Sequence, residues 1–162
     1  MYSGREICEF LQQARATHVV WLPDSYLGQW EADLRSSSAQ LVRVCREGEA
    51  WTIAAGLQLG GQRPIVMMQT TGLFESGDSL RNVAYDLRLP VFGVIGARNW
   101  LNASSRDSAK HFARPILDAW QIDYVVIESP SDKPLLAKHW QACQEPNLNP
   151  CPAPSGQTLS TY

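Results

Sequence analysis

Short apolar runs alternate with stretches of helical periodicity along most of the chain, and this alternation restricts the fold more than any other feature of the sequence. The runs most typical of strands are residues 17–22, 40–44, 64–69, 90–96 and 124–127. The run at 64–69 is almost wholly apolar, as expected for a strand that is buried on both faces. Strands that alternate with helices predict a three-layer α/β/α fold with a mainly parallel sheet.

Helical stretches fill the gaps between these runs. Helices are predicted at residues 4–16, 26–35, 47–60, 76–87, 109–120 and 132–143. The first is preceded by Ser3, which stands three residues before Glu6 as in a capping box. Residues 70–73, directly after the third strand, are predicted to form a turn.

Length and charge limit the organisation of the chain and its partners. The 162 residues suffice for one domain with a hydrophobic core. From Glu145 onward the sequence is rich in Pro, Asn and Ser and lacks periodicity, so residues 1–144 are predicted as the domain and 145–162 as a flexible tail.

The net charge of −2 gives no reason to expect nucleic acid or an anionic membrane as a partner. The sequence shows no signal-peptide pattern and no membrane-spanning run, so a cytoplasmic location is predicted.

Several common site motifs are missing from the sequence. The four cysteines stand at no metal-ligand spacing from one another or from a histidine, so no metal ligands are predicted in this chain. No Gly-x-Gly-x-x-Gly sequence and no P-loop follows a predicted strand. Dinucleotide and nucleoside triphosphate sites of these types are therefore not expected.

Polar residues follow four of the predicted strands at their carboxyl ends. They are Asp24 and Ser25 after the first strand, Glu47 after the second, Thr70 and Thr71 after the third, and the segment 98–111 after the fourth. Ligands of open parallel sheets bind at this edge, so these residues are predicted to face a single cleft. Each of them taken alone also fits an ordinary polar turn.

Glu47 opens the predicted third helix beside an apolar stripe. The stripe consists of residues at helical spacing, namely Ala50, Ile53, Ala54 and Leu57. A carboxylate at this place is expected to be partly buried at the start of the helix. Helix geometry alone also explains Glu47 as a first-turn acid that complements the helix dipole, which is worth about 0.3–1 kcal/mol.

The residues around Glu47 resemble a known family of domains. Glu47 followed by small residues, with Ala54-Ala55-Gly56 further along the helix, resembles the pyrimidine-binding (PYR) domain of thiamine diphosphate enzymes. Together with Pro23-Asp24-Ser25 and residues 68–73, the pattern resembles the α subunits of sulfopyruvate decarboxylases and the related phosphonopyruvate decarboxylases. Asp107 and His111 stand at the spacing of an Asp and a His that this family carries after its fourth strand.

The resemblance assigns roles to individual residues. In such a domain Glu47 hydrogen-bonds the aminopyrimidine ring of thiamine diphosphate, with a raised pKa that lets it share a proton. The other residues at the cofactor are expected to be Pro23, Thr70, Thr71 and Gly72. Asp24 and His111 are expected to handle protons during catalysis. The substrate is expected to contact Asp24, Ser25, Arg98 and Arg106.

The resemblance also implies a partner. Family members hold the diphosphate and Mg²⁺ through a pyrophosphate-binding (PP) domain with a Gly-Asp-Gly motif, and this sequence contains no Gly-Asp-Gly. The PP domain is therefore expected on a separate β subunit, in a hetero-oligomer with α–α or α–β contacts. The alanine-rich face of the Glu47 helix is interpreted as a surface for close helix contact with that partner.

The activity that the resemblance implies is the decarboxylation of a 2-oxo acid, with sulfopyruvate converted to sulfoacetaldehyde and carbon dioxide. Phe74 and Glu75 stand where the family has Gly-Asn, which changes the expected pocket wall. Two alternatives therefore stay open. One is a decarboxylase or carboligase subunit for another 2-oxo acid, and the other is a non-catalytic α/β binding or regulatory subunit.

Overall fold

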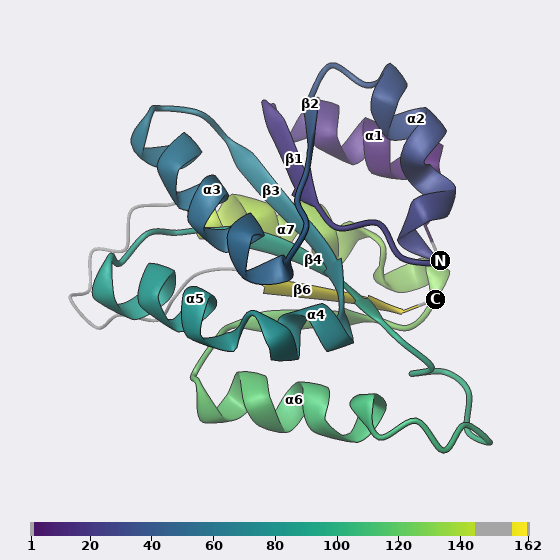
Figure 1. Ribbon diagram of the computed structural model, residues 1–162. Coiled ribbons are helices and arrows are strands. Elements are labelled where there is room, and N and C mark those ends of the chain that lie inside the picture. Colours follow the sequence, from purple (N-terminus) through teal and green to yellow (C-terminus); the bar gives the residue numbers. More distant parts are fainter. Residues whose placement is uncertain (1, 145–156, 162) are drawn as a thin grey trace.

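The computed structural model describes residues 2–144 and 157–161 of the chain (Figure 1). The strands are β1 (His18–Trp21), β2 (Gln40–Arg43), β3 (Pro64–Gln69), β4 (Phe92–Ala97), β5 (Tyr124–Ile127) and β6 (Gln157–Thr161). The α-helices are α1 (Gly4–Gln13), α2 (Glu31–Ser36), α3 (Glu47–Leu59), α4 (Thr70–Glu75), α5 (Gly77–Arg81), α6 (Ala109–Ala119) and α7 (Pro134–Gln144). Short 3-10 helices cover Leu27–Trp30 and Pro130–Asp132, and a π-helical turn covers Asn82–Asp86.

The six strands form one parallel sheet in the order β2-β1-β3-β4-β6-β5. In the centre of the sheet, His18 of β1 is in register with Pro64 of β3, and Trp21 is in register with Met67. Because all strands run in the same direction, all of their carboxyl ends lie at one edge of the sheet, where parallel sheets place their ligands.

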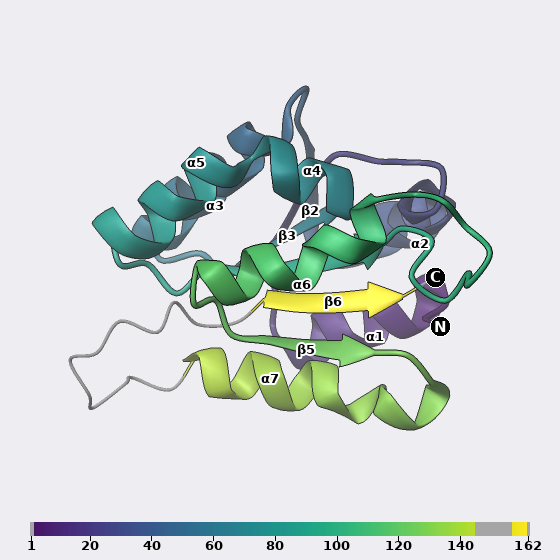
Figure 2. The same cartoon turned by 90° about the horizontal axis from the view of Figure 1, so that it is seen from below.

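Helices cover both faces of this sheet. The views in Figures 1 and 2 place α1, α2 and α7 on one face and α3, α4, α5 and α6 on the other. Side chains alternate along the central strand: Ile65 and Met67 belong to the core under α1, α2 and α7, whereas Val66 and Met68 belong to the core under the other helices. The predicted three-layer α/β/α class is confirmed.

The segment directly after β3 differs from the sequence prediction. Residues 70–73 are helical, because α4 begins at Thr70 without an intervening turn. The buried Thr70 hydroxyl donates a hydrogen bond to the Gly96 carbonyl of β4 over 3.0 Å, which ties the first residue of α4 to the neighbouring strand. This contact between residues far apart in sequence cannot be read from the local pattern.

The end of the chain also differs from the prediction. The predicted flexible tail covered residues 145–162, and within it Gln157–Thr161 form β6. β6 pairs on one side with β4 and on the other with β5, so it satisfies backbone groups that both strands would otherwise leave open. Residues 145–156 and 162 lie outside the described part, and the domain boundary at residue 144 stays a prediction.

The alanine face of α3 lies against the sheet of this same chain. Ala50, Ala54 and Ala55 are buried in the core under α3. Trp51 is also fully buried, and a Cβ atom on Gly93 of β4 would lie 2.7 Å from its ring. The small residues therefore let α3 approach its own sheet, and the interpretation of this face as a partner-binding surface is wrong.

The described residues contain neither a membrane-spanning helix nor a group of side chains suited to a metal ion. The longest described helix, α3, has 13 residues, and none of the described helices combines the length and the apolar character needed to cross a membrane. No three His, Cys, Asp or Glu side chains within residues 2–144 and 157–161 are grouped in a way that could hold a metal ion.

Candidate functional site

The carboxyl ends of three neighbouring strands line one cavity of about 270 Å³. Its lining consists of Asp24, Ser25 and Tyr26 after β1, Gln69 at the end of β3, and Arg98 and Asn99 after β4. The structure thus brings together three of the four strand ends that the sequence singles out. The fourth, which carries Glu47, lies at the same edge of the sheet but outside this cavity.

Asp24 lines this cavity, and one of its carboxylate oxygens has no hydrogen-bond partner among the described residues. Its Oδ1 accepts hydrogen bonds from the backbone N–H groups of Tyr26 and Leu27, at 2.6 and 3.0 Å, which holds the carboxylate at the start of the first 3-10 helix. Its Oδ2 is buried and accepts no hydrogen bond from any described residue. A buried polar atom without a partner is costly, so a hydrogen-bond donor that reached Oδ2 would be bound favourably.

Arg98 is held at the cavity by Asp107. The guanidinium Nε lies 2.8 Å from Oδ2 of Asp107, and the same oxygen accepts a hydrogen bond from Asn99 Nδ2 at 2.8 Å. The other oxygen accepts the backbone N–H of Ala109 at the start of α6. The hydrogen bonds from Ala109 and Asn99, followed by the charge of Arg98, lower the pKa of Asp107 below its usual value. This carboxylate therefore clamps the loop after β4 to α6.

We expect this clamp to make stability depend on pH. Because the folded pKa of Asp107 is lowered, its contribution to stability is present above the unfolded pKa of 3.8 and is lost as the pH falls through the folded pKa. At neutral pH, Asp107→Asn should lower the free energy of unfolding by about 1 kcal/mol, since the carboxylate is only partly shielded from water.

Urea unfolding of both proteins between neutral pH and pH 3 checks this expectation. The difference between wild type and Asp107→Asn should shrink toward the acid end of the series. The exposed Asp123, which makes no hydrogen bond to a described residue, provides the control substitution Asp123→Asn. A difference that stays constant down to acid pH would contradict the role of Asp107 as a charged clamp.

Glu47 is the first residue of α3, and its side chain packs against α4. The contact is with Gly72, where an added Cβ atom would lie 2.7 Å from Glu47 Oε1 and 2.9 Å from Cδ. Glu47 is half-buried, and its carboxylate forms no hydrogen bond or ion pair with any residue that the structure describes. Its hydrogen-bonding capacity is therefore available at the helix N-terminus, where the dipole favours a negative charge.

The neighbouring acids of α3 and α4 are all occupied. Glu75 accepts hydrogen bonds from the Arg46 guanidinium and from the backbone N–H of Gly48, and the hydrogen bond from Arg46 is the main cause that lowers the pKa of Glu75. Glu49 accepts the backbone N–H groups of Cys45 and Arg46. These contacts fix the start of α3 against α4 and leave Glu47 as the unpaired carboxylate within this described group.

The remaining predicted residues lie in different surroundings. The hydroxyl of Thr70 is used by Gly96, Thr71 is exposed, and Pro23 is half-buried beside Asp24. His111 and Arg106 are exposed and do not line the cavity. The structure therefore gathers Asp24, Ser25 and Arg98 at one place and Glu47 with Gly72 at another, and brings neither His111 nor Arg106 to the cavity.

Sequence reasoning missed Gln69 and Asn99 as lining residues. Gln69 could have been found, because it is the polar last residue of an otherwise apolar strand, at the ligand-binding edge. Asn99 has φ of 56°, a left-handed conformation that Asn tolerates better than most residues. Its partner Asp107 was noted for its spacing to His111, but the spacing gave no sign that it binds Arg98.

Comparisons with known proteins identify the fold. No protein-family profile and no curated protein sequence matches the chain. Among solved structures, the crystal structure of a benzoylformate decarboxylase from Polynucleobacter necessarius is similar, with a TM-score of 0.73 and 22% sequence identity. The match covers 99% of this chain but 30% of that chain. The chain thus has the fold of one part of a decarboxylase.

Proposed function

We propose that this chain is the PYR-domain (α) subunit of a thiamine diphosphate-dependent 2-oxo acid decarboxylase. The observation that carries the proposal is the Glu47 carboxylate at the first residue of α3, which packs on Gly72 and has no partner among the described residues. The likeness in fold to a benzoylformate decarboxylase supports it, because benzoylformate is itself a 2-oxo acid. The match covers 30% of the decarboxylase chain. In this proposal, the residues that hold the diphosphate and the metal lie outside the present chain.

The residues present fit an aminopyrimidine ring. Glu47 has a carboxylate free to form a hydrogen bond with a ring nitrogen, and the absence of a side chain on Gly72 leaves space for that carboxylate. Of the other residues proposed to hold the cofactor, Thr71 is exposed at the same turn of α4 and Pro23 flanks Asp24. Thiamine diphosphate, when bound, supplies the electron sink that the loss of carbon dioxide from a 2-oxo acid requires.

The chain's own groups would then hold and move protons. Glu47 would share a proton with the ring nitrogen through the hydrogen bond between them. Asp24, which lines the cavity, would act as a proton donor or acceptor beside the substrate. Arg98, held by Asp107, would pair with the anionic far end of the substrate. His111 and Arg106 have no role in this proposal, because they do not line the cavity.

A separate PP-domain (β) subunit completes the proposed enzyme. It would hold the diphosphate and Mg²⁺, and would cover the half-exposed Glu47 and the open side of the cavity. We therefore propose a hetero-oligomer in which the chain is inactive alone. Burial by the partner would also exclude water from the Glu47 carboxylate, which is the condition under which such a group shares a proton at neutral pH.

Sulfopyruvate is the proposed lead substrate, and Arg98 provides its test. Arg98→Gln should raise the KM for sulfopyruvate about tenfold in the assembled enzyme, because a charge-assisted hydrogen bond to the sulfonate is lost. The KM for pyruvate, which has no second anionic group, should change little. Carbon dioxide release from both acids measures the two constants.

Arg106→Gln is the matched control, since Arg106 lies on the same loop, is exposed and does not line the cavity. An equal rise in the KM for sulfopyruvate and for pyruvate in Arg98→Gln would refute the contact between Arg98 and the sulfonate. It would favour the alternative that the enzyme decarboxylates another 2-oxo acid or catalyses a carboligation. The alternative of a non-catalytic binding subunit requires that the assembled complex release carbon dioxide from none of the acids.

A further inference from the structure

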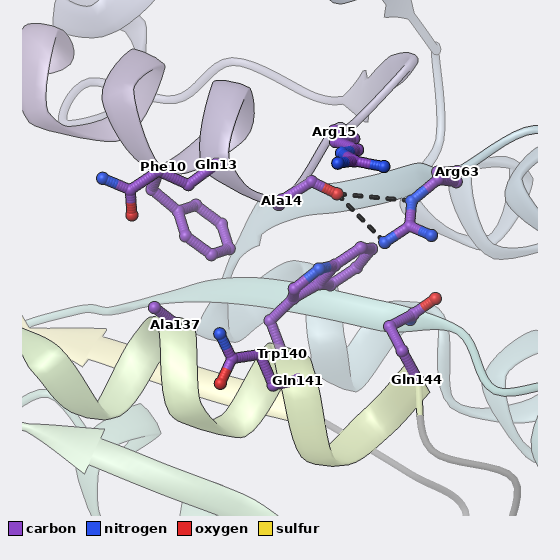
Figure 3. A pocket seen from close by; sticks show the side chains of 9 residues that line it. All are labelled: Phe10, Gln13, Ala14, Arg15, Arg63, Ala137, Trp140, Gln141 and Gln144. Carbon is purple, nitrogen blue, oxygen red and sulfur yellow. Dashed lines mark hydrogen bonds between the residues drawn. The ribbon is translucent and has the colours of Figure 1, made fainter.

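A second cavity lies at the opposite edge of the sheet, between the end of α1, the start of β3 and the helix α7 (Figure 3). Its volume is about 390 Å³, which is within the range of small-molecule sites. Arg63, which lines it, precedes β3, whereas Gln69 of the first cavity ends the same strand. Six extended residues span about 20 Å, so the two cavities are separate places.

Two arginines give this pocket a positive charge. Arg15 and Arg63 both line it, and its described lining contains no Asp or Glu. Neither guanidinium forms an ion pair with any residue among 2–144 and 157–161. In a chain whose net charge is −2, two lining cations without a counter-ion among the described residues form a local site that attracts anions.

Arg63 is held firmly in place. Its Nε and Nη2 donate hydrogen bonds to the carbonyl of Ala14 at 3.3 and 3.1 Å (Figure 3). Its backbone exchanges hydrogen bonds with Thr17. The guanidinium also lies 5.4 Å from the centre of the Trp140 ring. These contacts use two of its five N–H donors and fix the direction of the others, which is the arrangement of a prepared anion-binding group.

The rest of the lining is apolar and aromatic. Trp140 is almost fully buried and packs edge-on against Phe92 and Phe10, so its ring has a fixed orientation. Phe10 and Trp140 both line the pocket, and the amides of Gln141 and Gln144 stand at its side. A flat apolar group would lie against the aromatic side chains while its anionic group reaches the arginines.

We propose that this pocket binds a small organic anion with a flat apolar body, such as an aromatic carboxylate, at a site distinct from the cavity of Asp24 and Arg98. The proposal does not depend on the proposed enzymatic function. Binding is expected to use both the arginines and the aromatic side chains of the pocket. A ligand with the ring but no charge, or with the charge but no ring, should therefore bind more weakly than a ligand with both.

Calorimetric titration of the full chain with benzoate tests this, with benzamide and acetate as the neutral and the ring-free probes. Benzoate should bind at one site and more tightly than either comparison probe. Arg15→Gln should weaken benzoate binding about tenfold, the effect of losing one charged hydrogen bond. Arg15 is exposed and its side chain binds no described residue, so this variant should fold normally.

Two variants with the same change of charge locate the site. Arg5→Gln, at the far exposed end of α1, and Arg98→Gln, at the other cavity, should both leave benzoate binding unchanged. The proposal is overturned if benzoate does not bind, if benzamide binds as tightly, if Arg15→Gln has no effect, or if Arg98→Gln abolishes binding.

Discussion

Carbon dioxide release by the assembled enzyme should fall by about a hundred- to ten-thousandfold when Glu47 is replaced by Gln, the range observed when a proton-transferring group is lost. Gln keeps the size of the side chain and its contact with Gly72, but it cannot share a proton with a ring nitrogen. The stability of the chain should change little, because the Glu47 carboxylate has no hydrogen-bond partner within the described residues.

Glu49→Gln is the matched control for this experiment. Glu49 stands in the same first turn, is exposed, and accepts the backbone N–H groups of Cys45 and Arg46, which a Gln oxygen can also accept. Activity should therefore survive in Glu49→Gln. Equal activity of wild type and Glu47→Gln would show that Glu47 is only a first-turn acid. An equal loss of activity in Glu47→Gln and Glu49→Gln would mean that any charge change at the start of α3 impairs the enzyme, with no specific role for Glu47.

Gly72→Ala should lower carbon dioxide release by roughly a hundredfold, because a displacement of about 1 Å at a catalytic group has an effect of this size. The added Cβ atom would lie 2.7 Å from Glu47 Oε1, so the carboxylate must move. The fold should tolerate the change, since the group that gives way is a half-exposed side chain and Ala favours the helix more than Gly does.

Two comparisons separate this effect from a general loss of structure. Gly56→Ala adds a Cβ atom on α3 with nothing within 4 Å, so it should leave activity intact and stabilise the chain by about 0.5–1 kcal/mol. In the Glu47→Gln background, Gly72→Ala should cause little further loss, because both changes act on one group. A full additional hundredfold loss in the double variant would mean that Gly72 acts independently of Glu47.

The first five strands were predictable because each contains a short apolar run. The predicted run at 124–127 coincides with β5, and that at 64–69 coincides with β3. β6 was missed because it is polar, short and preceded by a Pro-rich segment, so its place depends on the two strands that it joins. The helix α4 was missed because its start is fixed by the contact of Thr70 with β4.

The candidate site was predictable as an edge of the sheet but not as an arrangement of side chains. The sequence indicates that Asp24, Glu47 and Arg98 follow strands, and parallel pairing then places them at one edge. It does not indicate that Asp107 binds Arg98 or that Glu47 packs on Gly72, because these contacts join residues from separate elements. The alanines of α3 were misassigned because helical spacing identifies an apolar face without saying what covers it.

Binding of thiamine diphosphate in the presence of Mg²⁺ tests the central claim most directly. Calorimetric titration would compare this chain alone, the candidate PP-domain subunit alone, and the co-purified pair in its wild-type and Glu47→Gln forms. The account predicts tight binding by the wild-type pair, weaker binding by the Glu47→Gln pair, and no comparable binding by either subunit alone. A stable pair that binds no thiamine diphosphate, or binds it equally with and without the Glu47 carboxylate, would contradict the account.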